Sequence, residues 1–369
     1  MKITGIELRR IAMPLRAPFR TSFGVESARD ILLLRVVTPE AEGWGECVAM
    51  SDPLYSSEYV EGAADVLKRY LIPTLPALGE RVSARAVKRA LKPFKGHRMA
   101  KAALETGVLD AQLRLSGESF GSFLGAARDR VPCGVSVGIM DSIPELLETV
   151  GGFVDEGYVR IKLKIEPGWD LAPVRAVRER FGADLLLQVD ANAAYTLADA
   201  RQLAKLDEFD LLLIEQPLAD DDLIQHAQLA KRMSTPICLD ESIESVEDAA
   251  AALTLGAASI INVKPGRVGG YLEAKAIHDL CVAHGVPVWC GGMLETGLGR
   301  AANVALAALP GFTLPGDTSA SRRYYATDIT TPFELADGHL DVPTGPGLGI
   351  EPIADILDSV TTSSEWIKF

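Results

Sequence analysis

The sequence predicts a closed β/α barrel combined with an α+β capping domain. From about residue 131 onward, short apolar runs rich in β-branched residues alternate with helix-like stretches of roughly 12–16 residues. About eight such units follow one another in about 200 residues, which is the usual size of a barrel and not of an open sheet. Residues 1–125 instead place strand-like runs before helix-like runs, which is typical of an α+β fold.

The capping domain is expected to use both ends of the chain. Apolar spacing predicts antiparallel strands at 3–11, 30–38 and 42–48, followed by helices at 57–70, 83–91 and 99–115. The tail leaves the barrel pattern again, with turn signals at 337–338 and 344–347. We therefore expect a capping domain at 1–125, a barrel at 126–329 and a C-terminal segment at 330–369 that returns to the cap.

The barrel strands are predicted from apolar runs and from the residues that precede them. Strands are expected at 131–139, 159–165, 184–191, 210–215, 236–240, 259–264, 287–290 and 312–315. Helices are expected between them, at 170–181, 197–206, 219–233, 246–255 and 271–284. Gly157, Gly182, Pro236 and Gly256 stand just before strands, where such residues end the preceding helix.

The composition restricts the class of protein. The chain has 369 residues, 48% hydrophobic and 24% charged, which is enough apolar material for a large core. Its formal net charge of −13 argues against a nucleic-acid or membrane partner, since both need a basic surface. No apolar run approaches the ~20 residues of a membrane-spanning helix, and the start lacks the apolar stretch of a signal peptide. Five cysteines without C-x-x-C spacing indicate reduced residues of a cytoplasmic enzyme.

Ionisable residues end five successive barrel strands. In chain order they are Lys164, Asp190, Glu215, Asp240 and Lys264, at intervals of 26, 25, 25 and 24 residues. Each interval is one β/α unit, so all five side chains should stand around one rim of the barrel, where barrel active sites form. A single acid after a strand is often only a helix cap or turn residue. Five in succession are hard to explain as caps.

Three carboxylates on one rim repel one another unless a cation holds them together. Oxygen ligands without a suitable His or Cys favour Mg²⁺ or Mn²⁺ and not zinc. Lys162 and Lys164 are two residues apart on one strand, so both should face the barrel interior. A cation-lined pocket lowers the pKa of a lysine toward a value at which it acts as a base. The pattern therefore predicts metal-assisted removal of the α-proton of a carboxylate substrate through an enediolate, with a lysine on either face.

With these motifs the sequence resembles the enolase superfamily, in its muconate-lactonising-enzyme subgroup, and within that the N-succinylamino acid racemase / o-succinylbenzoate synthase group. Further matching motifs lie at 17–24, 42–47, 54–59, 96–105, 133–140, 263–270, 290–300 and 315–321, so the likeness covers essentially the whole chain. The resemblance implies a modified TIM barrel of the (β/α)₇β type under a cap. It also implies a cytoplasmic enzyme that acts on a small-molecule carboxylate. The enzyme would be a homo-oligomer, with an octamer as one possible form.

The resemblance also assigns residues. Asp190, Glu215 and Asp240 would bind the divalent metal, Mg²⁺ or Mn²⁺. Lys164 and Lys264 would be the acid/base pair, with Lys162 supporting Lys164 and the substrate carboxylate. The substrate contacts would be Ser136, Asn192, Gly291, Gly292, Met293 and Leu294 on the barrel, with Phe19, Thr21, Ser22, Phe23 and Tyr55 on cap loops. Glu241 would lie behind the metal ligands, and Arg267 beside Lys264.

Several alternatives stay open for these residues. Phe19, Phe23 and Tyr55 could belong to the core between cap and barrel, and Arg267 could be a surface residue of the following helix.

The activity itself also has alternatives. The resemblance implies racemisation of N-acylamino acids, N-succinyl ones in particular, and syn-dehydration to o-succinylbenzoate, so the cellular task could be racemisation, menaquinone biosynthesis or both. A dipeptide epimerase or muconate cycloisomerase would share the five strand-end residues. Epimerases of this kind usually carry D-x-D near the eighth strand, whereas this chain has Asp317-Thr318-Ser319, which favours an N-acyl substrate. A Schiff-base aldolase using Lys264 would leave the carboxylates unexplained, and a non-catalytic barrel would not be expected to keep all five groups.

Overall fold

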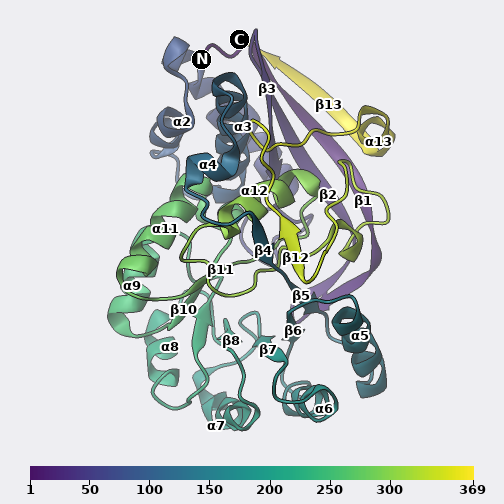
Figure 1. Cartoon of the computed structure of the whole chain (residues 1–369). Coiled ribbons are helices and arrows are strands. Elements are labelled where there is room, and N and C mark those ends of the chain that lie inside the picture. The colour runs from purple at the N-terminus through teal and green to yellow at the C-terminus, as the bar shows by residue number, and fades with distance from the viewer.

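The computed structural model describes residues 1–369 and has the predicted barrel and cap (Figure 1). A four-stranded antiparallel sheet in the order β13-β1-β2-β3 belongs to the cap, and a seven-stranded parallel sheet in the order β11-β10-β9-β8-β7-β6-β5 forms the barrel. Both chain ends lie together at the top of the cap in Figure 1. None of the helices combines the length and apolar character that crossing a bilayer demands.

The cap sheet is built from strands at both ends of the chain. Its members are β1 (Gly5–Thr21), β2 (Gly24–Val37), β3 (Glu42–Cys47) and β13 (Thr361–Lys368). The C-terminal β13 pairs antiparallel with β1 from Gly5 opposite Lys368 onward. β1 and β2 are longer than predicted, because they continue past the core as a hairpin that turns near Ser22. The extension carries Pro14 and polar residues, which hide its strand pattern in the sequence.

The cap helices cover one face of this sheet. They are α1 (Val60–Val66), α2 (Ala84–Leu91), α3 (Arg98–Ser116) and α4 (Phe120–Leu124). The helix predicted at 57–70 is shorter, since α1 passes into a π-helical turn at Leu67–Leu71 and then into a 3₁₀ turn at Ile72–Thr74. The central helix α3 is buried along most of its length against β3.

The contact between β3 and α3 requires glycine at position 45. A Cβ atom on Gly45 would overlap the carbonyl oxygen of Ala103 and lie 2.9 Å from the nitrogen of Gly107. We expect Gly45→Ala to lower the free energy of unfolding by about 1–3 kcal/mol, measured by urea or thermal unfolding. The control is Gly152→Ala within α5 (Ile143–Asp155), where a Cβ meets nothing within 4 Å. A Gly45→Ala protein as stable as the control would contradict this packing.

The barrel strands come in chain order around the sheet. They are β5 (Gly134–Val137), β6 (Arg160–Lys164), β7 (Leu186–Asp190), β8 (Ile214–Glu215), β9 (Ile237–Leu239), β10 (Ile260–Val263) and β11 (Val288–Cys290). The helices that surround them are α5, α6 (Leu171–Phe181), α7 (Ala200–Leu203), α8 (Leu223–Leu229), α9 (Val246–Leu255), α10 (Pro265–Val268), α11 (Tyr271–Ala283) and α12 (Gly297–Ala307). Thus α6, α9 and α11 nearly match their predicted ranges, whereas the helices predicted at 197–206 and 219–233 are broken or shorter.

Three predicted barrel strands differ in the structure. The strand predicted at 210–215 is reduced to the two residues of β8. The run predicted at 312–315 forms only isolated bridges, from Phe312 to Val288 and from Gly316 to Cys133, which close the barrel between β11 and β5. Pro315 lacks the N–H that a continuous ladder needs. The run predicted at 131–139 divides into β5 and a separate β4 (Arg130–Pro132), which pairs with β12 (His339–Asp341) outside the barrel.

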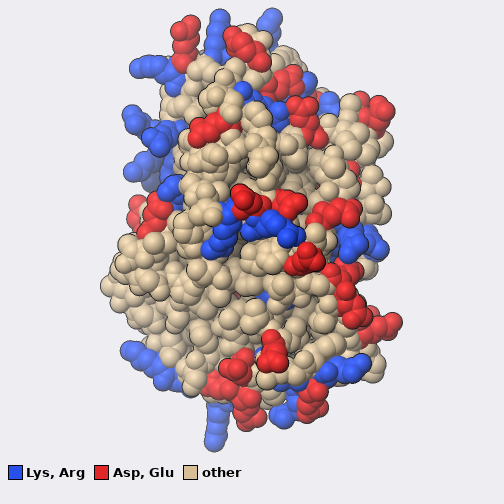
Figure 2. All heavy atoms as spheres, in the orientation of Figure 1, with Lys and Arg blue, Asp and Glu red and all other residues tan.

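Three hydrophobic clusters hold these parts in place. One cluster of 66 buried residues lies largely in the barrel and its helices, and another of 27 lies largely in the cap. A cluster of four, Leu213, Cys238, Ile260 and Trp289, lies under the lysine side chains, because Lys162 Nζ stands 4.8 Å from the centre of the Trp289 ring. In Figure 2, Lys and Arg side chains gather along the edge of the cap where α2 lies in Figure 1.

The cap hairpin rests on the barrel rim. The Ile139 N–H donates to the Arg20 carbonyl at 3.0 Å, just beyond β5. The Ser22 hydroxyl donates to the carbonyls of Ala191 and Asn192 at 3.2 and 3.3 Å, just beyond β7. The hairpin therefore covers the end of the barrel at which strands β5 to β11 finish.

Candidate active site

The five strand-end residues lie at one end of the barrel and are buried there. Lys164 stands opposite Asp190, and Asp190 opposite Glu215, in the paired strands β6, β7 and β8. Asp240 and Lys264 directly follow the next two strands, β9 and β10. The three carboxylate residues are fully buried, and the two lysines are 7% and 5% exposed.

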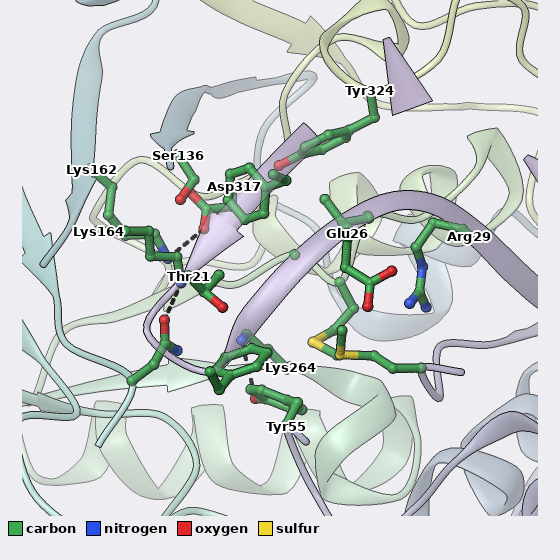
Figure 3. A pocket seen from close by; sticks show the side chains of 17 residues that line it. Thr21, Glu26, Arg29, Tyr55, Ser136, Lys162, Lys164, Lys264, Asp317 and Tyr324 are labelled. Atoms are coloured by element: carbon green, nitrogen blue, oxygen red, sulfur yellow. Dashed lines mark hydrogen bonds and ion pairs between the residues drawn. The ribbon is translucent and has the colours of Figure 1, made fainter. Parts of the chain in front are cut away.

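The two lysines belong to different ion pairs. Lys164 Nζ donates to Asp190 Oδ2 and to Asn192 Oδ1, both at 2.6 Å. Lys264 Nζ donates to Asp240 Oδ2 at 2.7 Å and to the Tyr55 hydroxyl at 3.1 Å. Figure 3 shows Lys164 and Lys264 on separate sides of the pocket, with their amines directed into it. A small molecule between them could be contacted from two directions.

Burial and neighbouring charges act differently on the two lysines. Burial lowers the pKa of Lys164, and Lys162 lowers it further, against the opposing effect of Asp190. Burial also disfavours the charged form of Lys264, but Tyr55 and the carboxylates around it outweigh burial and raise the pKa of Lys264. The expected lowering of a lysine pKa thus holds for Lys164 and not for Lys264. The reason is that Lys264 faces more negative groups than positive ones.

The predicted metal ligands face lysines in this structure. Lys162 Nζ lies 3.2 Å from Asp190 Oδ2 and 2.9 Å from Glu215 Oε2, and Asp240 also pairs with Arg267. As arranged, no three His, Cys, Asp or Glu side chains are grouped closely enough to hold a metal ion. The donor set itself suits a hard divalent cation, because it consists of carboxylate oxygens on adjacent strand ends.

The residue after Asp240 supplies a structural reason to expect a cation here. Glu241 Oε1 accepts a hydrogen bond from Asn192 Nδ2 at 2.8 Å, while Glu241 Oε2 is buried without any hydrogen-bond partner. Burial, together with the charge of Asp190, raises the pKa of Glu241 to about 7. This carboxylate oxygen is buried beside three more carboxylates and could accept one further positive partner. The residues therefore fit a divalent metal.

A pocket opens above these side chains, between the barrel and the cap hairpin (Figure 3). It encloses about 570 Å³ of space, part of which is open to solvent. Most of the predicted substrate contacts line it: Phe19, Thr21, Phe23, Tyr55, Ser136, Asn192, Gly292, Met293 and Leu294, together with Lys162, Lys164 and Lys264.

Some predicted contact residues lie outside the pocket wall. Ser22 instead fixes the hairpin to the rim through its hydroxyl. Gly291 packs against Lys264, where a Cβ atom would lie 2.7 Å from Lys264 Cε.

Arg267 is only 3% exposed, which excludes the alternative of a surface residue. Its guanidinium pairs with Asp240 and donates to the carbonyls of Ile243 and Asn262.

The prediction missed several residues of this region. Glu26, Arg29, Met50, Asp317 and Tyr324 also line the pocket. Asn262 donates to Glu215 Oε1 at 2.6 Å, from a position two residues before Lys264. Strand alternation could have found Asn262, because residues two apart share a face. No comparable signal marks Glu26 and Arg29, since the strand that carries them belongs to the cap.

Asp317, which lines the pocket, is held by two cations. Its carboxylate lies 2.7 Å from Lys162 Nζ and 2.8 Å from Arg160 Nη1. Burial disfavours the charge of Asp317, but Lys162 and Arg160 outweigh burial and lower the pKa of this carboxyl. The same carboxylate is therefore not free to bind a substrate ammonium group.

Comparison with known proteins gives consistent matches over the whole chain. The model described as "Mandelate racemase / muconate lactonizing enzyme, N-terminal domain" matches residues 3–125, and "Enolase C-terminal domain-like" matches residues 145–356. The N-succinylamino acid racemase of Amycolatopsis sp is 69% identical over 367 residues, covering 100% of both chains. The o-succinylbenzoate synthase of Geobacillus kaustophilus is 48% identical, covering 95% of this chain and 94% of that protein.

Solved structures agree with these sequence matches. The crystal structure of an enolase superfamily member from Listeria innocua superposes with a TM-score of 0.95 at 40% identity, covering 100% of this chain and 99% of that one.

Proposed function

Since this chain belongs to the enolase superfamily, in the group of mandelate racemase and muconate lactonizing enzyme, we propose that it removes the α-proton of an N-acylamino acid and returns a proton to either face. The observation that carries the proposal is the placement of Lys164 and Lys264 on two sides of one pocket. N-Succinylamino acids are the proposed substrates, after the relative at 69% identity. Syn-dehydration to o-succinylbenzoate is the second proposed reaction, after the relative at 48%.

Each lysine serves one face of the α-carbon. In its neutral form, the amine of Lys164 takes the α-proton from one enantiomer, which agrees with the lowered pKa of this residue. Lys264, as an ammonium, gives a proton to the opposite face, and the reverse reaction exchanges the two roles. Lys162 keeps its charge beside Asp317 and Glu215 and stabilises negative charge that develops on the substrate carboxylate.

Asp190, Glu215 and Asp240 would hold a divalent metal ion, which we propose to be Mg²⁺. Enolase-superfamily sites use such an ion to stabilise the enediolate. The lysines must leave the carboxylates for this, because Lys164 and Lys264 occupy carboxylate oxygens in the structure. We further propose that the protein is a cytoplasmic homo-oligomer.

An N-acyl substrate is favoured over a free dipeptide. A dipeptide epimerase needs a carboxylate at the eighth strand position to receive the substrate ammonium. Here Asp317 already pairs with Lys162 and Arg160, and Ser319 stands two residues later. A Schiff-base role of Lys264 is disfavoured, because it would leave the buried carboxylates of Asp190, Glu215 and Asp240 without a function.

The direct test is an assay of the purified protein reconstituted with Mg²⁺. We expect racemisation of N-succinyl-phenylalanine from either enantiomer, followed by polarimetry, and dehydration of the o-succinylbenzoate precursor, followed by absorbance. A dipeptide with a free amino group, such as L-Ala-L-Glu, serves as the comparison and should react at least about tenfold more slowly, since its ammonium has no free carboxylate partner. Faster reaction of the dipeptide would contradict the proposal.

A further inference from the structure

The two ends of the pocket differ in chemistry (Figure 3). Ser136 and Asp317 lie at one end, next to Lys162 and Lys164, and the Ser136 hydroxyl is buried without a hydrogen-bond partner. Glu26 and Arg29 lie at the other end, away from these lysines, on the cap strand β2. Nothing in the proposed proton transfer uses Glu26 or Arg29.

Glu26 is a carboxylate without a partner on the pocket wall. Its side chain is only partly exposed and makes no hydrogen bond or ion pair, while its main chain belongs to the β1–β2 ladder. Burial raises the pKa of Glu26, the charge of Arg29 lowers it, and the charge of Asp52 raises it further. Glu26 thus places a negative charge at this end of the pocket that only Arg29 compensates.

Arg29 is a buried cation without a directly bound carboxylate. It is 2% exposed, and its Nη2 atom donates to the carbonyls of Val48 and Ala49 at 3.0 and 3.3 Å. Its Nε and Nη1 atoms are buried and have no hydrogen-bond partner. Two carbonyl oxygens therefore balance the charge of Arg29 only in part, and its field acts on this end of the pocket.

The polar end suits the acyl group of an N-acylamino acid. The free Ser136 hydroxyl and the neighbouring cations can hydrogen-bond to amide and carboxylate oxygens. With the α-carbon between Lys164 and Lys264, the amino-acid side chain then extends toward the other end. Met50 and Met293 also line the pocket, and flexible thioethers adapt to side chains of different shape.

We propose that Glu26 and Arg29 together select substrates by the charge of the amino-acid side chain. This inference rests on the proposed function and adds the subsite that reads the side chain. The charges of Glu26 and Arg29 oppose each other, and the exposed Asp52 is screened by water. A charged side chain is then attracted by one group and repelled by the other, so it gains little to offset the loss of its own hydration, and neutral side chains bind best.

Removing either charge should shift the preference in a definite direction. Glu26→Gln keeps the shape and leaves the guanidinium of Arg29 uncompensated, which favours acidic side chains. Arg29→Met keeps an unbranched chain of similar length and leaves the carboxylate of Glu26 uncompensated, which favours basic side chains. The two variants therefore move specificity in opposite directions, which a general loss of packing would not do.

The experiment compares kcat/KM for N-succinyl derivatives of methionine, glutamate and lysine, whose side chains are similar in length. Wild type should prefer methionine over both charged substrates. Glu26→Gln should raise the glutamate-to-methionine ratio about tenfold to a hundredfold, and Arg29→Met should raise the lysine-to-methionine ratio by a similar factor. Glu61→Gln is the matched control, because Glu61 is on the cap but pairs with Arg10 away from the pocket and should leave both ratios unchanged.

Different failures point to different errors. If wild type racemises N-succinylmethionine but Glu26→Gln leaves the glutamate ratio unchanged, the charge-selecting subsite is wrong. If Glu26→Gln instead changes the ratio of N-succinyl- to N-acetylmethionine, the acyl group occupies this end and the inference is also wrong. Absence of racemisation with every substrate would overturn the proposed function itself. Should Arg29→Met fail to fold, the ratio measured for Glu26→Gln decides alone.

Discussion

Replacement of Lys264 by alanine is expected to lower racemisation of N-succinylamino acids by at least about 10³-fold, because one face of the α-carbon loses its acid/base group. Lys164→Ala should cause a similar loss. Each variant should still exchange the α-proton of one enantiomer with deuterium from the solvent, and the two variants should retain opposite enantiomers. Incubation of each pure enantiomer in deuterium oxide, followed by proton NMR, measures both exchange and racemisation.

The exchange pattern separates a chemical role from a structural one. Lys275→Ala is the matched control, because Lys275 pairs with Asp279 on the surface of α11 and should keep full activity. Thermal unfolding shows whether the loss of the Lys264–Asp240 pair has disturbed the fold. If either active-site variant racemises at close to the wild-type rate, the assignment of two bases is wrong. Loss of exchange from both enantiomers in both variants would also contradict the assignment of one base to each face.

Removal of the divalent metal is also expected to have a large effect on the rate of the reaction. Turnover should cease in excess chelator and return on addition of Mg²⁺, since the ion would stabilise the negative charge that develops on the substrate carboxylate. Glu215→Gln keeps the size of the side chain and removes one charged ligand. We expect this variant to lose at least about a hundredfold in metal affinity, measured by calorimetry, given that even residues behind a metal ligand contribute about 10–100-fold.

Stability gives a readout that does not depend on activity. A ligand that binds only the folded state stabilises it by about 2.7 kcal/mol at a concentration of 100 Kd, so Mg²⁺ should raise the melting temperature of the wild type. Glu215→Gln should show a much smaller rise. Glu247→Gln, on α9 away from the five strand-end residues, is the control and should behave like the wild type. Full activity in excess chelator would contradict a metal-dependent reaction.

The sequence allowed the barrel to be predicted because strand-like and helix-like runs alternate along it. It allowed the site to be predicted because Lys164, Asp190, Glu215, Asp240 and Lys264 are one β/α unit apart, and the structure has them at successive strand ends. The closing segment could not be predicted in detail. Whether 312–315 forms a ladder or isolated bridges depends on Pro315 and on how the closing barrel meets β5 and β11, which no local pattern contains.

The pocket was predictable only in part, for a similar reason. Residues on a strand have a fixed face, so Lys162 could be placed from its spacing to Lys164, whereas Ser136 and Asn192 were assigned through the resemblance to the family. Glu26 and Arg29 reach the pocket only because the β1–β2 hairpin extends past the core and rests on the rim. The contact between the hairpin and the rim joins residues far apart in the chain, and no local pattern in a single sequence indicates it.

On the ribosome, β1 emerges long before its partner β13 exists. About 340 residues separate the end of β1 from the start of β13, which corresponds to roughly 20–70 s of synthesis at about 5–20 residues per second. During that interval β2 can pair with one side of β1, while the other side exposes free backbone N–H and C=O groups. A nascent chain of this protein therefore carries an open strand edge on β1 for most of translation, and an edge of this kind can pair with a neighbouring nascent chain.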